Sequence, residues 1–311
     1  MRAIRVTEFG DPEVLVLRDV PDLEPVGDEI LVKVQAAGVN PVDTYVRSGN
    51  YAGLPPLPYT PGSDAAGVLA DGGARVYVAG ALGGTYAECA LCRPDQVHPL
   101  PDDISYAQGA ALGVPYATAF RALFQRGRAV AGDTLLVHGA SGGVGLAAVQ
   151  FALHADLKVV ATAGSMAGGE LVANQGDVRV LDHRDPAHVA AAFALTGDHG
   201  FDLVVEVSAH QNLGDDLTLL AKDGRVVVIG SRGPVEVNPR DLMSHDGAVF
   251  GMMLFNASQA ELSEAHAAIG AGLRSGALRP VVGREFPLAD AARAHRHVME
   301  RPALGKVVLV P

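Results

Sequence analysis

The segment Leu135–Val149, which reads LLVHGASGGVGLAAV, constrains the fold of this chain more than any other. An apolar β-like run stops abruptly in glycines, and a helical pattern of small residues follows without a gap. The spacing Ala140-x-Gly142-x-x-Gly145 matches the dinucleotide fingerprint G-x-G-x-x-G, with alanine in place of the first glycine. In such a turn Gly142 lets the backbone approach a pyrophosphate, and Gly145 lets the helix pack closely on the strand. Because the exposed N–H groups of a helix N-terminus attract phosphate, we expect nucleotide binding here.

Composition limits the class of protein. The chain of 311 residues is long enough for two domains, and 49% hydrophobic with 19% charged residues is typical of a globular protein. The formal charge of −11 disfavours nucleic-acid binding, which normally needs a basic face. No apolar run reaches the ~18 residues that span a bilayer, and the start MRAIRVTEFG lacks the apolar region of a signal peptide. We therefore expect a cytoplasmic protein with no nucleic-acid or membrane partner.

The only two cysteines, Cys89 and Cys92, have the spacing of half a zinc site. Cys89 lies in GTYAECAL, which alternates like a strand, and Cys92 directly follows this run. Residues three apart on a strand point to opposite faces. The chain has no second pair that could complete four ligands. We expect both thiols to be structural, without a disulfide.

The pattern of expected secondary structure changes along the chain. The first ~115 residues show short β-like runs separated by Gly, Pro and Asp, which predicts a mostly antiparallel β domain. From about Pro115 helical and strand patterns alternate, which predicts a parallel sheet with helices on both faces. One helix is expected over Leu213–Ala221, with Asn212 as a possible N-cap. We expect the tail to rejoin the first domain. The six expected parallel strands are Thr134–Val137, Lys158–Ala163, Val178–Leu181, Leu203–Val207, Arg225–Ile229 and Ala248–Leu254.

Six longer motifs are spread over nearly the whole chain: Ala36–Tyr51, Pro58–Gly67, Gln108–Leu123, Leu136–Ala148, Val228–Gly233 and Asn238–Asp241. They resemble the zeta-crystallin, or NADPH:quinone oxidoreductase, branch of the medium-chain dehydrogenase/reductase superfamily. The resemblance implies an α/β protein with two domains. Residues 1–116 and 256–311 would form a GroES-like, mostly antiparallel β catalytic domain. Residues 117–255 would form a Rossmann dinucleotide-binding domain, a doubly wound six-stranded parallel sheet.

The motifs also indicate whether the chain binds a catalytic zinc ion. Zinc-dependent relatives carry Cys where this chain has Asn40, and Gly-His-Glu where it has Gly62-Ser63-Asp64. A catalytic zinc needs three protein ligands, and the side chains of Asn40 and Ser63 are poor substitutes. The resemblance therefore implies the zinc-independent branch, with no metal-ligating residues.

Carried over position by position, the resemblance implies two groups of site residues. Asn40 and Tyr45 would position the substrate or the nicotinamide. The cofactor would contact Tyr45, Thr118, Ser141, Gly142, Gly143, Val144, Gly164, Ser165, His183, Asn212, Ile229, Gly230, Ser231, Arg232, Met252, Met253 and Leu254. Four of these residues could have an ordinary structural role instead of a cofactor contact. Arg232 could be a solvated charge, His183 a surface histidine, and Met252 and Met253 part of the core.

The end of the second parallel strand bears on the choice of cofactor. NAD-preferring enzymes place Asp or Glu about 20 residues after the glycine turn, to bond the ribose 2′-OH. Here the chain reads Ala163-Gly164-Ser165, so no carboxylate repels a 2′-phosphate and Ser165 can donate to it. Glu170 would oppose a phosphate if it pointed inward, and His183 or Arg184 would compensate. We expect NADPH rather than NADH.

The expected function is a zinc-independent quinone oxidoreductase that transfers reducing equivalents from NADPH to a quinone. An NADPH-dependent reductase of activated alkenes, such as a 2-alkenal or an enoyl thioester, is the alternative within the same class. A cofactor-binding structural or redox-reporting protein with little turnover is the alternative from another class. The resemblance also implies a homodimer or homotetramer, and Val249–Leu254 is apolar enough to pair edge to edge.

Overall fold

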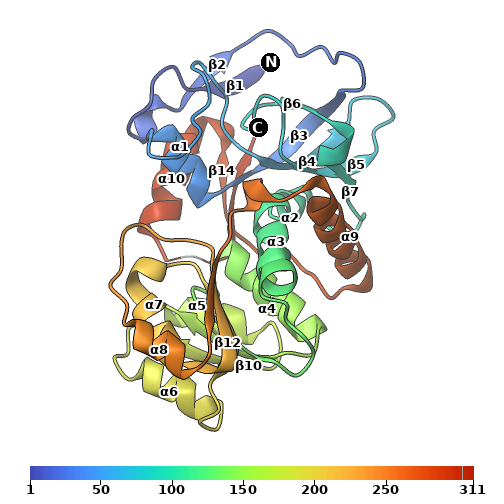
Figure 1. Ribbon diagram of the computed structural model, residues 1–311. Helices are drawn as coiled ribbons and strands as arrows, with labels where there is room; N and C mark the ends of the chain where they lie inside the picture. The colour runs from blue at the N-terminus through green and yellow to red at the C-terminus, as the bar shows by residue number, and fades with distance from the viewer. Residues whose placement is uncertain (303) are drawn as a thin grey trace. The chain divides into compact units, whose positions relative to one another are not determined.

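The computed structural model describes residues 1–302 and 304–311, and the chain divides into two units (Figure 1). Unit 1 comprises Met1–Pro115 and His266–Pro311, and unit 2 comprises Tyr116–Ala265. Two helices, α3 (Gly113–Phe120) and α9 (Gln259–Ser275), run through the two points where the chain passes between units. Among the described helices, none combines the length and apolar character needed to cross a membrane.

Unit 2 is built on one six-stranded sheet in the order β10-β9-β8-β11-β12-β13, in which all neighbours are parallel. Its strands are β8 (Thr134–Val137), β9 (Lys158–Ala163), β10 (Val178–Asp182), β11 (Phe201–Glu206), β12 (Leu220–Val228) and β13 (Ala248–Gly251). From the centre, the chain runs outward to β10 on one side and then to β13 on the other. Because parallel crossovers are right-handed, the two directions place helices on opposite faces. The predicted doubly wound sheet is confirmed, and its strand order reverses between β8 and β11.

Helices connect these strands and bury both faces of the sheet. They are α4 (Gly143–His154), α5 (Met166–Ala173), α6 (His188–Leu195), α7 (Ala209–Thr218) and α8 (Pro239–Ser244), and a π-helix over Arg121–Arg126 continues α3. The central strand β8 shows why the sequence gives this arrangement. Leu135, Leu136 and Val137 are all fully buried, as a parallel strand covered on both faces requires.

The helix expected over Leu213–Ala221 is misplaced. Helix α7 already begins at Ala209 and ends at Thr218, and Leu220 and Ala221 belong to β12. Leu220 pairs with Phe201 of β11, and both side chains are completely buried. An apolar run at a helix–strand junction fits either pattern, and here the strand pairing prevails. Asn212 consequently lies inside α7, whose N-cap is Ser208, so the possible N-cap role of Asn212 is wrong.

Unit 1 contains a seven-stranded sheet and a small two-stranded one. The larger sheet has the order β14-β15-β3-β4-β5-β7, with β6 also paired to β3, and only its β14–β15 pair is parallel. Its central strand is the long β3, and its strands β14 and β15 come from the C-terminal part of the chain. The strands are β1 (Arg2–Arg5), β2 (Val16–Asp19), β3 (Ile30–Val39), β4 (Asp64–Leu69), β5 (Arg75–Ala79), β6 (Cys89–Cys92), β7 (Val97–Pro99), β14 (Val282–Pro287) and β15 (Lys306–Val310).

The helices of unit 1 are α1 (Pro41–Arg47), α2 (Tyr106–Gly109) and α10 (Ala291–Glu300). Helix α10 contributes Ala291 and Ala294 to a core that joins strands from both ends of the chain, including Ile4, Val34 and Leu309. The two cysteines lie on β6 as free thiols; Cys92 is buried and Cys89 is half-buried. This difference in burial agrees with thiols on opposite faces of a strand.

Candidate functional site

In unit 2 the expected cofactor residues gather at one edge of the sheet. With the exception of Thr118, which is buried on α3, each group expected in this unit follows the carboxyl end of a parallel strand. The groups come after β8 (Ser141–Val144), β9 (Gly164 and Ser165), β10 (His183), β11 (Asn212), β12 (Ile229–Arg232) and β13 (Met252–Leu254). Open α/β sheets bind ligands at this edge, beside the point where the strand order reverses.

The glycine turn between β8 and α4 has the geometry that a phosphate site needs. Gly139 has φ +60°, and the N–H of Ala140 donates to the Thr162 carbonyl at 2.9 Å, which ties the turn to β9. A Cβ on Gly145 would lie 2.5 Å from Ala140 Cα, so only glycine lets α4 pass this close to the turn. The first N–H groups of α4 have no partner within the helix and carry the positive end of its dipole.

The end of β9 brings several expected residues into contact with one another. A Cβ on Gly164 would lie 2.5 Å from His183 Nε2, so the imidazole rests against this glycine. Ser165 is the N-cap of α5, where its Oγ accepts the N–H of Gly168 at 3.1 Å and keeps its own proton to donate. A Cβ on Gly168 would lie 3.0 Å from the Oγ atoms of both Ser141 and Ser165. These two hydroxyls, from different loops, therefore flank the same glycine.

The loops after β12 and β13 present their residues with different exposure. A Cβ on Gly230 would lie 2.6 Å from the Val207 carbonyl oxygen, so the two strand ends approach closely here. Arg232 is exposed, and its backbone N–H donates to His210 Nδ1 at 3.2 Å. Met252 is buried, whereas Met253 is 42% exposed, so the core alternative does not apply to Met253.

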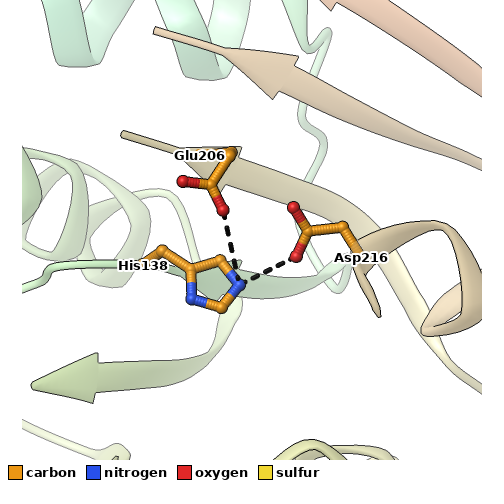
Figure 2. A group of neighbouring side chains, drawn as sticks. All are labelled: His138, Glu206 and Asp216. Atoms are coloured by element: carbon orange, nitrogen blue, oxygen red, sulfur yellow. Dashed lines mark hydrogen bonds and ion pairs between the residues drawn. The ribbon is translucent and has the colours of Figure 1, made fainter. Parts of the chain in front are cut away.

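Sequence reasoning missed a buried polar cluster beneath this edge, made of His138, Glu206 and Asp216 (Figure 2). His138 Nε2 lies 2.9 Å from Asp216 Oδ1 and 3.8 Å from Glu206 Oε2. Burial raises the pKa of both carboxyl groups to about 7 and lowers that of the imidazole. A signal was present in the sequence, since Glu206 is the one charged residue in the run Leu203–Val207 and His138 directly precedes the glycine turn.

Unit 1 holds a second buried network, centred on Asp64. The Asn40 Nδ2 donates to Asp64 Oδ2 at 2.8 Å, and Lys306 Nζ donates to the same oxygen at 2.9 Å and to Asn40 Oδ1. The other oxygen, Asp64 Oδ1, accepts the N–H of Val114 at 2.7 Å. All three side chains of the network are at most 4% exposed. The Asn40 amide, which we expected to position a substrate, therefore forms hydrogen bonds with the buried ion pair of Asp64 and Lys306.

A pocket of 440 Å³ lies beside this network in unit 1. Its lining includes Val46, Ser63, Leu82 and Asp43, together with the prolines of the loop before Gly62. Asp43 Oδ2 accepts the N–H of Asn40 at 2.8 Å and the hydroxyl of Tyr86 at 3.0 Å. Burial raises the pKa of Asp43 to about 6. The half-buried Tyr45 lies on the same helix, α1, and among the described residues its hydroxyl has no hydrogen-bond partner.

Comparisons with known proteins cover the full chain. Residues 27–102 match the family described as "Alcohol dehydrogenase GroES-like domain", and residues 176–309 match "Zinc-binding dehydrogenase". The quinone oxidoreductase of Rattus norvegicus is 46% identical over 321 residues, which cover 100% of this chain and 98% of that protein. The Escherichia coli quinone oxidoreductase complexed with NADPH superposes with a TM-score of 0.90 at 29% identity, covering 100% of both chains. A mycobacterial protein complexed with NADPH gives a TM-score of 0.90 at 33% identity and the same coverage.

Proposed function

The chain belongs to the quinone oxidoreductase family of the medium-chain dehydrogenase/reductase superfamily, and we propose that it transfers reducing equivalents from NADPH to a quinone without a zinc ion. The observation that supports this best is the convergence of the expected cofactor residues at the carboxyl edge of the six parallel strands. The close approach of Gly145 to Ala140 and of Gly164 to His183 fits a bound dinucleotide, because bulkier residues would displace the turns.

The residues at the end of β9 support NADPH over NADH. No carboxylate occupies this position, and the Ser165 hydroxyl and the His183 imidazole lie where a ribose 2′-phosphate would need donors. Arg184, the other expected basic group, is paired with Asp182 at 2.6 Å, so His183 is the better candidate. Glu170, which would oppose a phosphate, is exposed on α5.

Bound NADPH supplies a hydride, and the protein has to orient it and keep water away. We assign the cofactor to unit 2, where Ser141–Val144 and the N-terminus of α4 would hold the diphosphate. We assign the acceptor to unit 1, where the 440 Å³ pocket offers space. Helix α1 lines this pocket through Asp43 and Val46, and Tyr45 on the same helix has a free hydroxyl that can donate. A quinone is already a strong acceptor, so alignment with the cofactor contributes more than polarisation of its carbonyl.

The network around Asp64 supports zinc independence, although part of the chain matches a family named for zinc binding. Asp64 stands where zinc-dependent relatives have Glu, and its two oxygens accept hydrogen bonds from Asn40, Lys306 and Val114. An ammonium group at this carboxylate repels a divalent cation. Asn40 and Ser63 add no strong ligand.

The test is cofactor oxidation with a panel of quinones and activated alkenes, with and without a chelator. We expect turnover of quinones that is faster with NADPH than with NADH and unchanged by the chelator. Turnover of enones alone would favour the alkene reductase, and binding without turnover would favour the structural or redox-reporting alternative. Loss of activity in chelator, restored by zinc, would contradict zinc independence.

A cytoplasmic location and a homodimer or homotetramer stay predictions. Strand β13 supports the second, since it lies at the edge of the sheet and pairs only with β12 among the described strands. Val249 on this strand and Phe255 just after it are 39% and 58% exposed. An exposed apolar edge strand is suited to pairing with a second copy.

A further inference from the structure

The buried cluster His138–Glu206–Asp216 lies at the point where the strand order of unit 2 reverses. His138 directly follows β8, and Glu206 ends the neighbouring strand β11. Asp216 reaches them from α7, and Figure 2 shows its carboxyl group directed toward the imidazole and Glu206. The three side chains are 4%, 0% and 0% exposed, so solvent does not stabilise charge on any of them.

A chain of hydrogen bonds connects the cluster to the glycine turn. The N–H of Gly139 donates to Thr162 Oγ1 at 3.3 Å, and this hydroxyl lies 3.2 Å from His138 Nδ1. The hydroxyl proton is then free to go to Nδ1, and Nε2–H donates to Asp216 Oδ1. This assignment makes the imidazole neutral, in agreement with the effect of burial on its pKa.

Glu206 connects the cluster to a second cofactor loop. Its Oε1 accepts the N–H of Ser208, and its Oε2 accepts Asn212 Nδ2 at 3.0 Å. Its backbone carbonyl accepts the N–H of Ile229 at 2.7 Å. Three loops that carry expected cofactor residues are therefore connected through the cluster.

The cluster would carry more negative charge than its neighbours can neutralise if both of its carboxyl groups were ionised. With a neutral imidazole, two buried carboxyl groups share one small space, and among the described residues no lysine or arginine pairs with either. The other titratable groups with electrostatic influence here are Asp215 on α7 and His183 after β10. Asp216 Oδ2 is completely shielded from solvent and has no hydrogen-bond partner. A single proton held between the Asp216 and Glu206 carboxyl groups would satisfy this oxygen and remove one of the two charges.

We infer that His138, Glu206 and Asp216 are positioning residues for the dinucleotide turn and share one proton, and that cofactor binding strengthens their hold on it. The inference rests on the proposed function. A dinucleotide brings the negative charge of its diphosphate to the turn next to His138, and a nearby negative charge favours the protonated form of a carboxyl group. Binding should therefore take up protons near neutral pH, and affinity should fall as the pH rises.

Titration calorimetry tests this when it is run in two buffers of different ionisation enthalpy between pH 6 and pH 8. For the unmodified protein we expect a fraction of a proton taken up at pH 7 and a several-fold weaker affinity at pH 8 than at pH 6. Linkage limits the change to about tenfold per pH unit for each proton. Because the 2′-phosphate of NADPH itself titrates, NADH provides a reference that lacks this group.

Matched variants separate this role from a purely structural one. Glu206→Gln and Asp216→Asn should make the affinity for the cofactor nearly independent of pH. They should also abolish the part of the proton uptake that does not come from the 2′-phosphate of NADPH. Asp215→Asn removes the same charge from the exposed neighbouring residue, which acts on the cluster only through its electrostatic field, and should keep the proton uptake. Equal proton uptake by Glu206→Gln and the unmodified protein would overturn the inference. Zero uptake by the unmodified protein would also overturn it, and this result does not depend on the folding of any variant.

Metal analysis of the purified protein gives a further test. One divalent cation bound per chain at this cluster would contradict a shared proton, because the metal ion would then balance the carboxylates. Absence of any binding would refute the proposed function as well, whereas binding without proton uptake would refute the inference alone.

Discussion

Replacement of Lys306 by methionine tests the buried ion pair of unit 1. The ammonium group donates to Asp64 Oδ2 and Asn40 Oδ1, and the side chains of Lys306 and Asp64 are 4% and 0% exposed. Lys306→Met keeps most of the apolar stem and removes the charge. It leaves a carboxylate in the core without a cation.

Removal of one partner from a buried ion pair costs about 3–5 kcal/mol. Asp64 would keep its hydrogen bonds from Asn40 and Val114, so we expect a loss near the lower bound, about 3 kcal/mol. This is a large share of the ~5–15 kcal/mol that stabilises an ordinary protein.

Urea unfolding at pH 8 measures the loss, with the exposed Lys33→Met on β3 as a control expected to stay within ~0.5 kcal/mol. The double variant Asp64→Asn/Lys306→Met should lose less than the sum of the single variants, with a coupling energy of about 1–3 kcal/mol. Strict additivity, or a Lys306→Met variant as stable as the unmodified protein at pH 8, would refute the reasoning.

Three further predictions concern the site and acid stability. Gly145→Ala should raise the KM for NADPH at least tenfold, because its Cβ would meet Ala140 Cα at 2.5 Å, whereas Gly233→Ala, with nothing within 4 Å, should be neutral in the same kinetic assay. Burial lowers the pKa of His266 to about 4 and that of His295 to about 3, so the unfolded chain binds more protons below pH 6.5. Each should therefore reduce the free energy of unfolding by about 2 kcal/mol between pH 7 and pH 5, and His266→Asn should lessen the loss in urea titrations. Tyr45→Phe should raise the KM for quinones with little change in that for NADPH, and unchanged quinone kinetics would remove Tyr45 from the mechanism.

Much of the fold was predictable because its signals are local. The glycine turn after Thr134–Val137 and the alternation of apolar strands with helices predicted the sheet of unit 2. The error at Leu213–Ala221 arose where local patterns are ambiguous, since Leu220 and Ala221 are apolar enough for a helix or for a buried strand. Only the pairing of Leu220 with Phe201 of β11 decides between the two.

The polar networks were not predictable from local patterns. Asp64 and Lys306 are 242 residues apart, and His138 and Asp216 are 78 apart. Nothing near Lys306 distinguishes it from a surface lysine. Its burial follows from the pairing of β15 with β3, which is a property of the whole sheet. The expected role of Asn40 illustrates the same limit, because its amide faces partners that only the assembled unit brings together.

The position of Lys306 on β15 also affects the order in which the two units can fold during synthesis. Unit 2 is one continuous stretch, so a ribosome releases all of it before the counter-ion of Asp64 has been made. Until then the nascent first 115 residues lack both β15, which flanks β3, and the cation for their buried acid. Unit 2 can therefore fold early, whereas unit 1 waits for the codons of β15, and a premature stop before them would leave unit 2 whole but unit 1 without Lys306.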